Sequence, residues 1–477
     1  MTVLDHFTRL SAVPRPSKRE ERVVAFVMGF GESLQLDTRR DGIGNILIKK
    51  PASPEKENAP AVALQAHLDM VHQQNAGTHH DFDTEGIKLI REGDWLRADG
   101  TTLGADNGMG VAAIMAVLSN RDLVHGPIEA LFTVDEETGM TGAKALRSDW
   151  LTAPYLLNLD TEEDDELCIG CAGGVDVTIS GALLMEPAPA GGVALRVMIR
   201  GLSGGHSGMD IDKGLANANH LLARLLLAGE DTGLQVSRID GGTLRNAIPR
   251  EASAVVLVHD EGAFRQNLQR AADDIEREYA RTDPDLAIAV TAAAVPQPIL
   301  CIDQAVQPRL LRALAATPSG IYRMSPEAPG LVQTSNNLAR VRVGDGAFEV
   351  LCLTRGSVDS ERDHFARVIG GLYAGVGGSY ELSGEYPGWS PKPGSALLDV
   401  MRGVYERRFG ESPRVSVVHA GLECGIIGAK YPEMEMVSFG PNILGAHSPD
   451  ERAQVSSVEK FWGYLVEALE ELAGAAV

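Results

Sequence analysis

The sequence predicts an α/β fold into which a second α/β domain is inserted. Short apolar strands alternate with helical patterns along the first part of the chain, for example at 62–65, 109–119 and 128–134. The strand 128–134 is apolar apart from Glu129 and Thr133, which is typical of a strand covered on both faces. Another alternation of strands and helices begins near residue 191 and ends near residue 386. We therefore expect three segments, the first and last of which form one domain: 1–190, 191–386 and 387–477.

The composition argues against several classes of partner. The chain has 43 Lys and Arg against 65 Asp and Glu, a net charge of -22, and its acidic residues are spread along the sequence. We expect neither nucleic acid nor an anionic membrane as a partner. Five scattered cysteines suit a reducing compartment, and no apolar stretch has the length of a signal peptide core or a membrane helix. We therefore expect a cytoplasmic protein.

The first elements lead toward an apolar strand with a polar end. A helix is predicted over 4–12, and Ser17 with Glu20 has the spacing of a capping box at the start of a second helix. Strands at 44–50 and 62–65 follow.

His67 and Asp69 stand where the second of these strands stops. Because side chains alternate along a strand, the two point to the same face. A metal-ligating imidazole commonly donates its other ring N–H to a carboxylate. The pair is a candidate ligand with its orienting acid, and an ordinary hydrogen-bonded surface pair is the alternative.

Asp106 lies in a glycine-rich turn, ADGTTLGADNGMG, before the predicted helix 109–119. Glycine allows the backbone to approach a compact group, and the turn would present the carboxylate from a fixed position. The alternative is an ordinary aspartate N-cap.

Two further strands end in acids. The strand 128–134 runs into Glu136 and Glu137, and the strand 155–159 runs into Asp160. Neighbouring carboxylates at the end of a buried strand repel one another unless a cation neutralises them. The carboxyl ends of strands are also where open α/β sheets place their sites.

Two loops near the C-terminus add polar side chains. A strand at 434–439 precedes a Gly- and Pro-rich loop containing His447, and a strand at 415–418 precedes a loop containing Glu423. The candidate constellation comprises seven residues: His67, Asp69, Asp106, Glu136, Glu137, Asp160 and His447.

Imidazoles and carboxylates without a thiolate suit a pair of Zn²⁺ or similar ions. The charges of Asp106, Glu137 and Asp160, together with a hydroxide, would balance two dications. The residues alone therefore favour a two-metal site.

The whole chain resembles the di-zinc exopeptidases and deacylases, a family that includes carboxypeptidase G-like enzymes, aminoacylases and carnosinases. Within that family it is most similar to the branch of bacterial aminoacyl-histidine dipeptidases. The resemblance is carried by QAHLDMV, DGTTLGADNG, TVDEETGMTGA, NLDTEE, GGHSG, GGTLRNAIPRE, HAGLECG and LGAHSPDE. It implies a mixed-sheet di-zinc exopeptidase catalytic domain with an inserted α/β lid domain of two related sandwich units.

The resemblance also implies roles for the constellation. Asp106 would bridge two ions, His67 and Asp160 would complete one of them, and Glu137 with His447 the other.

In the same family a carboxylate orients the first imidazole and a glutamate is the general base, which assigns these roles to Asp69 and Glu136. The family further implies a cis peptide between Asp106 and Asn107.

Further residues resemble substrate contacts of the family: His206, Asn246, Asn336, Asn337, Arg355 and Glu423. His206 would stabilise the oxyanion, Arg355 would bind the C-terminal carboxylate, and Glu423 would hold the free amino end. A local partner in a turn is the alternative for the histidine and the asparagines. An unliganded strand-end arginine and an indirect role near the metals are the alternatives for Arg355 and Glu423.

The implied activity is hydrolysis of unblocked dipeptides, including Xaa-His and carnosine-like substrates, by a metal-bridging hydroxide and a glutamate base. Two divalent ions would be needed, Zn²⁺ first, with Mn²⁺ or Co²⁺ as alternatives. A tripeptide aminopeptidase, an N-acyl amino acid hydrolase and a non-catalytic metal-binding module are the alternative functions. The family also implies a homodimer through the lid.

Overall fold

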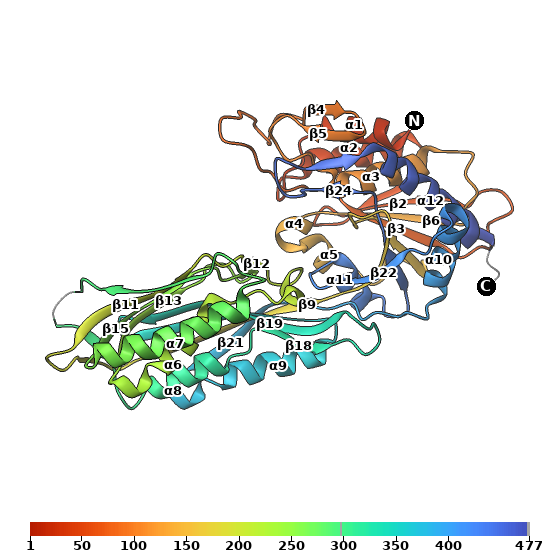
Figure 1. Cartoon of the computed structure of the whole chain (residues 1–477). Coiled ribbons are helices and arrows are strands. Elements are labelled where there is room, and N and C mark those ends of the chain that lie inside the picture. The colour runs from red at the N-terminus through yellow and green to blue at the C-terminus, as the bar shows by residue number, and fades with distance from the viewer. Residues whose placement is uncertain (296–297, 475–477) are drawn as a thin grey trace. The chain divides into compact units, whose positions relative to one another are not determined.

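The computed structural model describes residues 1–295 and 298–474, which form two compact units (Figure 1). The first unit comprises Met1–Gly170, Pro391–Val417 and Leu422–Val477, and the second comprises Cys171–Ser390 and Val418–Gly421. The second unit thus starts before residue 191 and ends after residue 386, which corrects both predicted boundaries.

The first unit is built on a mixed eight-stranded sheet. Its strands are, in spatial order, β1 (Asp37–Arg40), β2 (Ile46–Lys50), β6 (Ile128–Thr133), β3 (Val62–His67), β7 (Tyr155–Asn158), β23 (Glu435–Ser438), β8 (Glu166–Cys171) and β22 (Arg414–Val418). The four central strands β6, β3, β7 and β23 run parallel, while β1, β2 and β8 pair antiparallel with their neighbours. Every residue of β3 and β6 is buried, which confirms for β6 the prediction of a strand covered on both faces.

The helices of the first unit surround this sheet (Figure 1). They are α1 (Val3–Ser11), α2 (Glu21–Ser33), α3 (Ala105–Ser119), α4 (Glu136–Gly139), α5 (Thr141–Ala145), α10 (Ala396–Phe409), α11 (Glu423–Lys430) and α12 (Val455–Gly474). Helix α3 is buried on nearly all sides, because its sequence is apolar all round, and it packs against α1 and β3. A small antiparallel sheet completes the unit, in the order β24 (Ile443–Leu444), β25 (Arg452–Gln454), β5 (Trp95–Ala98) and β4 (Leu89–Glu92).

The predicted capping box at the start of α2 is wrong. The helix begins at Glu21 without a side-chain cap from Glu20. The Ser17 hydroxyl instead lies 2.8 Å from Asp69 Oδ2, and Glu20 Oε1 accepts the N–H of Asp135 at 3.1 Å. Both residues are therefore used for tertiary contacts next to the candidate site.

The second unit is built on one continuous antiparallel sheet. Its strands are, in spatial order, β16 (Ala287–Ala292), β11 (Val193–Arg200), β15 (Ala252–Val258), β13 (Gln235–Gly241), β19 (Val332–Gly344), β20 (Ala347–Gly356), β9 (Gly173–Ala182) and β21 (Ser379–Tyr386), with β18 (Gly320–Met324) paired to β19. Helices α6 (Ala218–Ala228), α7 (Glu261–Tyr279), α8 (Gln307–Ala316) and α9 (Asp359–Gly371) cover one face (Figure 1). Short pairs join β10 (Met185–Pro187) to β17 (Leu300–Ile302) and β12 (Gly205–His206) to β14 (Ala247–Ile248). The remaining elements are the 3-10 turns Ile211–Lys213, Glu230–Thr232 and Ala374–Val376.

The sheet has two halves with the same strand order. Each half is a βαββαβ unit, and its strands can be numbered in chain order. In space the first half runs β16, β11, β15, β13, which are its fourth, first, third and second strands. The second half repeats this order as β21, β9, β20, β19. The halves join where β13 pairs with β19. Because β9 supplies the first strand of the second half, the first half is an insertion after β9. This is why the second unit begins near residue 171 and not at 191.

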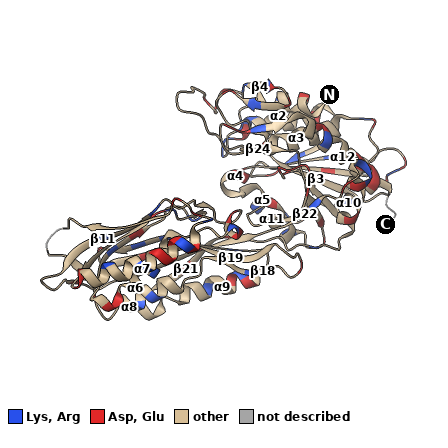
Figure 2. Ribbon diagram, viewed as in Figure 1, with Lys and Arg blue, Asp and Glu red and all other residues tan. Residues whose placement is uncertain are grey.

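Acidic and basic residues both occur in each unit (Figure 2). Among the described residues, no helix combines the length and the apolar character that crossing a bilayer requires.

Candidate metal centre

Three parallel strands bring the candidate acids to one edge of the first sheet. Strand β3 lies between β6 and β7, and all three run in the same direction. His67 ends β3 and Asp69 follows it, Glu136 and Glu137 follow β6, and Asp160 follows β7. Because the ends of adjacent parallel strands meet, side chains from distant parts of the sequence converge there.

The carboxylate of Asp106 stands between two imidazoles. Its Oδ1 lies 3.1 Å from Nε2 of His67, and its Oδ2 lies 3.1 Å from Nε2 of His447. His67 Nε2 is also 3.4 Å from Oδ1 of Asp160, and His447 Nε2 is 3.0 Å from Oε2 of Glu137. Two clusters, each of one imidazole and two carboxylates, thus share Asp106. The peptide between Asp106 and Asn107 is cis, as the family resemblance implies.

This donor set fits two divalent cations. The ligand atoms of His67, Asp106 and Asp160 lie within 4.8 Å of one another, and so do those of Asp106, Glu137 and His447. The Oε1 atom of Glu137 is buried and has no hydrogen-bond partner among the described residues. Imidazole nitrogens with carboxylate oxygens are the ligands of zinc and related ions, and a cation would satisfy the orphaned oxygen.

The electrostatics of the cluster favour positive charge at both imidazoles. Hydrogen bonds to Asp106 and Glu137 raise the pKa of His447 to about 11. Burial opposes the charged form of His67, but Asp160 and Asp106 raise the pKa of that imidazole well above its usual value. Burial likewise opposes ionisation of Asp106, yet the two imidazoles hold the pKa of that carboxyl below its usual value. Bound cations would replace the protons that this cluster otherwise retains.

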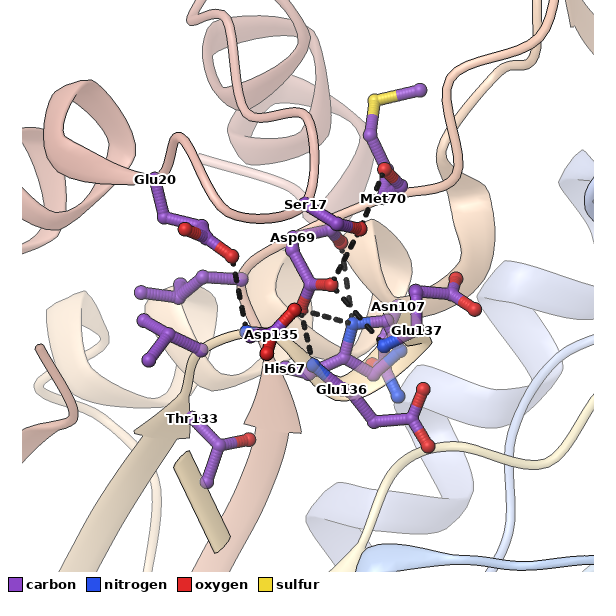
Figure 3. Close-up of polar contacts among 12 residues, drawn as sticks. Ser17, Glu20, His67, Asp69, Met70, Asn107, Thr133, Asp135, Glu136 and Glu137 are labelled. Atoms are coloured by element: carbon purple, nitrogen blue, oxygen red, sulfur yellow. Dashed lines mark hydrogen bonds and ion pairs between the residues drawn. The ribbon is translucent and has the colours of Figure 1, made fainter. Parts of the chain in front are cut away.

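Asp69 links three parts of the site (Figure 3). Its Oδ1 lies 3.4 Å from Nδ1 of His67, on the ring edge opposite Asp106. Its two oxygens also accept the backbone N–H groups of Glu136 at 3.0 Å and Glu137 at 3.2 Å. One buried carboxylate therefore orients an imidazole and holds the turn that carries two acids.

Glu136 differs from its neighbours in its surroundings. Its carboxylate extends away from Asp69 (Figure 3) and lies within 4.8 Å of ligand atoms of His67 and Glu137. Burial raises the pKa of Glu136 well above its usual range, and the carboxylates of Asp160 and Glu423 add to the effect. A half-buried carboxyl with a raised pKa is suited to taking up and returning a proton.

Glu423 lies at the start of α11 and is fully buried. Its Oε2 accepts from Gln65 Nε2 and from the Thr133 hydroxyl, both at 2.6 Å. The amide orientation of Gln65 is set by Asn158, whose Nδ2 donates to Gln65 Oε1 at 2.5 Å. Both donors bond to the same oxygen, and within the part of the chain that the structure describes Oε1 of Glu423 has no hydrogen-bond partner. That oxygen is available to a cationic group.

The other predicted substrate contacts belong to the second unit. Arg355 is buried and donates to the hydroxyl of Tyr386 at 2.8 Å. His206 Nδ1 accepts the N–H groups of Gly208 and Met209, so Nε2 carries the hydrogen of the neutral ring. This Nε2 lies 3.5 Å from Nη2 of Arg355. Both His206 Nε2 and Arg355 Nη2 are donors, so they do not bond to each other. An acceptor such as a carboxylate could bind to both.

The asparagines have different environments. Asn336 and Asn337 lie within β19 and not in a turn. The Asn336 amide donates to Pro318 O and accepts from Thr354, and the Asn337 amide donates to the carbonyl of Ala247. These hydrogen bonds favour the alternative that the side chains of Asn336 and Asn337 stabilise the local structure. Asn246 is exposed in the loop after β13.

Two buried charged residues beside the site were not predicted from the sequence. Arg15 donates to the carbonyls of Leu68, Asp69 and Gly104, and Glu451 accepts from the turn that carries Asp106. The available signals were weak: Arg15 stands between two prolines, and Glu451 ends the LGAHSPDE segment. Neither their burial nor their partners can be read from residue type.

A mixed sheet that presents two imidazoles around one shared carboxylate can hold two metal ions, as the sites of two-metal hydrolases do. Residues 63–471 match the profile of Peptidase family M20/M25/M40, and the chain belongs to that family.

The comparisons with known proteins agree with this assignment. The chain is 42% identical over 471 residues to the cytosol non-specific dipeptidase of Escherichia coli strain K12, with 98% of this chain and 97% of that protein covered. The crystal structure of aminoacylhistidine dipeptidase from Vibrio alginolyticus superposes with a TM-score of 0.92 at 40% identity, with 98% of this chain and 96% of that chain covered. Aminopeptidase PepT from Bacillus cereus shares the fold, with a TM-score of 0.57 at 17% identity over 99% and 98% of the two chains.

Proposed function

We propose that this protein is a two-metal dipeptidase that hydrolyses the amide bond of unblocked dipeptides, Xaa-His dipeptides among them. The observation that carries the proposal is the carboxylate of Asp106 set between the imidazoles of His67 and His447. The two relatives that match almost the whole chain at 42% and 40% identity are both named dipeptidases, which supports the substrate class.

The ions would be held by five side chains. Asp106 would be shared, His67 and Asp160 would complete one set, and Glu137 with His447 the other. Nitrogen and oxygen ligands fit Zn²⁺ best, and Mn²⁺ or Co²⁺ are the alternatives. When bound, such ions supply Lewis acidity, which polarises the substrate carbonyl and makes a water easier to deprotonate.

The chain itself supplies the proton transfers. Glu136 would take the proton of the attacking water and later deliver it to the leaving amine. Asp69 assists by holding the backbone N–H of Glu136 and by fixing His67 from the opposite edge of the ring. The raised pKa of the Glu136 carboxyl suits a group that must both accept and return a proton.

Substrate recognition would use charges at the two ends of a dipeptide. Oε1 of Glu423 is the acceptor offered to the free ammonium group, because Gln65 and Thr133 occupy only Oε2. The guanidinium of Arg355 would bind the C-terminal carboxylate, and His206 would donate to the oxyanion. Exposed Asn246 would contribute a further polar contact. The second unit would accordingly act as the substrate-binding lid, and we extend the proposal to a homodimer formed through it.

The E. coli relative carries the word cytosol in its name, which supports a cytoplasmic location for this chain. We propose small peptides as its partners, and neither nucleic acid nor membranes.

A panel of substrates tests the proposal. Carnosine, other Xaa-His dipeptides, generic dipeptides, tripeptides and N-acetyl amino acids should be compared by kcat/KM with the zinc-loaded enzyme. Dipeptides are expected to be cleaved at least tenfold faster than the others. A preference for tripeptides or for N-acetyl amino acids would assign the chain to another activity of the same family, and zinc binding without turnover would make it a binding module.

A further inference from the structure

The buried carboxylate of Glu451 accepts hydrogen bonds from four consecutive backbone amides. Its side chain is 2% exposed. Oε2 accepts from Leu103 at 2.7 Å and Gly104 at 2.9 Å, and Oε1 accepts from Ala105 at 2.7 Å and Asp106 at 3.3 Å. All four N–H groups belong to the turn that starts α3. These groups have no partner within the helix, so Glu451 provides the cap that the local sequence lacks.

This cap comes from a distant part of the chain. The sequence separation between Glu451 and Asp106 is 345 residues. A carboxylate at a helix N-terminus is favoured both by hydrogen bonding and by the helix dipole. The N–H of Asp106 is one of the four donors. Because of this hydrogen bond, Glu451 restrains the residue whose carboxylate stands between the two imidazoles.

Glu451 also belongs to the segment that carries His447. The segment is compact: the N–H of Glu451 donates to Ser448 O at 3.1 Å, and the N–H of Ser448 donates to Gly445 O at 3.3 Å. His447 has a φ of +64°, which a non-glycine residue rarely adopts. The segment therefore depends on its attachments to keep this imidazole in place.

The two proposed metal sets differ in how they are supported. His67 ends β3, and Asp160 stands two residues past the end of β7, so the sheet holds both. Asp106 and His447 lie on a turn and a loop, and Glu451 joins the two. The N–H of Gly104 donates to Glu451, and its carbonyl accepts from Arg15, so the same turn is held from both sides.

We propose that Glu451 is a positioning residue that sets the distance between Asp106 and His447, and with it the affinity for the ion that these residues share with Glu137. The inference rests on the two-metal centre proposed above. It predicts an unequal effect. Loss of the hydrogen bonds to Glu451 lowers the affinity for the ion held by His447 more than the affinity for the ion held by His67 and Asp160.

The test is a metal titration of Glu451→Gln against a matched control. Glutamine keeps the shape of the side chain, but its NH₂ group faces two of the four N–H donors instead of accepting from them. The control is Glu129→Gln, because Glu129 is 3% exposed and accepts the backbone N–H groups of Thr152 and Ala153 at the other end of β6. Zinc and cobalt binding to the metal-free full-length proteins should be measured by competition with a chromophoric chelator, together with thermal unfolding of the metal-free forms.

Both variants are expected to unfold at a lower temperature than the wild type. Only Glu451→Gln should weaken one of two zinc sites, by about ten- to a hundredfold, as loss of a residue that orients a metal ligand commonly does. Two sites of wild-type affinity in Glu451→Gln, or an equal loss in Glu129→Gln, would overturn the inference. A wild-type protein that binds fewer than two ions would instead overturn the proposed two-metal function.

If Glu451→Gln does not fold, Glu451→Asp offers a second route, because it keeps the carboxylate but shortens the side chain by one methylene group, so that the carboxylate cannot reach all four N–H groups. Selective weakening of the same ion supports the inference, and unchanged affinity contradicts it.

Discussion

Nε2 of His447 lies 3.1 Å from Oδ2 of Asp106, although 341 residues separate the two in sequence. The other oxygen of the same carboxylate lies 3.1 Å from His67. One aspartate thus holds two imidazoles on its two oxygens, and each imidazole meets a further carboxylate.

Replacing Glu136 should stop turnover without removing metal. In Glu136→Gln the proton acceptor is lost while the backbone N–H that donates to Asp69 remains, so kcat should fall by a factor of about 10²–10⁴. Zinc content, measured by atomic absorption, should stay at the wild-type value. Glu163→Gln is the control, since Glu163 is exposed and pairs with Arg414. Turnover within a factor of two of the wild type would remove Glu136 from the role of base.

Removing one imidazole should remove one ion. His447→Ala leaves Asp106 and Glu137 as the remaining ligands of its set, and the set of His67 and Asp160 stays complete. Metal stoichiometry should fall from two to one, and activity should be lost with it. Chelation of the wild-type protein should abolish activity, and Zn²⁺, Mn²⁺ or Co²⁺ should restore it. Exposed His364 provides the control, His364→Ala, which should bind two ions. Two tightly bound ions in His447→Ala would contradict the ligand assignment.

Glu423 should determine the preference for a free amino group. Glu423→Gln keeps the shape but removes the charge from the oxygen that faces no partner, so KM for a dipeptide should rise by about tenfold or more. Inhibition by the matching N-acetyl dipeptide should change little, because that compound carries no ammonium group. Gln65→Met frees the carboxylate to rotate and should shift KM in the same direction. Equal losses for both kinds of compound would indicate a general structural role.

Arg355 should be specific for a terminal carboxylate. Arg355→Lys loses the planar fork that donates to Tyr386, so KM for dipeptides should rise by about tenfold or more, while dipeptide amides should be little affected. Arg340→Lys is the matched control, because the Arg340 guanidinium pairs with Asp240 in the same sheet. The same loss for acids and amides would argue against carboxylate binding.

His6 should make the first unit sensitive to acid. Burial lowers the pKa of His6 from its usual value near 6.5 to about 4. The unfolded chain therefore takes up the proton first, and stability present at neutral pH is lost as the pH falls from about 6.5 toward 4, by roughly 2 kcal/mol between pH 7 and pH 5. His6→Leu should reduce this loss in urea unfolding measurements. An unchanged pH slope in His6→Leu would refute the assignment.

Local sequence was sufficient for the central part of the fold. Strands β3, β6 and β7 could be predicted because each is a short apolar run, and helix α3 because its pattern is apolar over several turns. Their polar ends could be recognised as candidate ligands because imidazoles and carboxylates rarely gather at buried strand ends without a cation to bind. The family resemblance added the cis peptide at Asp106, which the structure contains.

Contacts between distant segments decided the rest. Ser17 and Glu20 have the spacing of a helix cap, but tertiary hydrogen bonds to Asp69 and Asp135 take precedence over the local pattern. Strand β9 joins the second unit because its edges are paired there, a fact that no local periodicity contains.

The sequence by itself thus determined which side chains could bind metal and which strands present them. Only the tertiary structure decided which oxygen of Asp106 meets which imidazole, and that Glu451 holds the turn between them. The physical reason is that residue type and periodicity report local conformation and burial. Hydrogen-bond partners hundreds of residues apart are chosen only when the sheet closes and buried polar groups must all be satisfied.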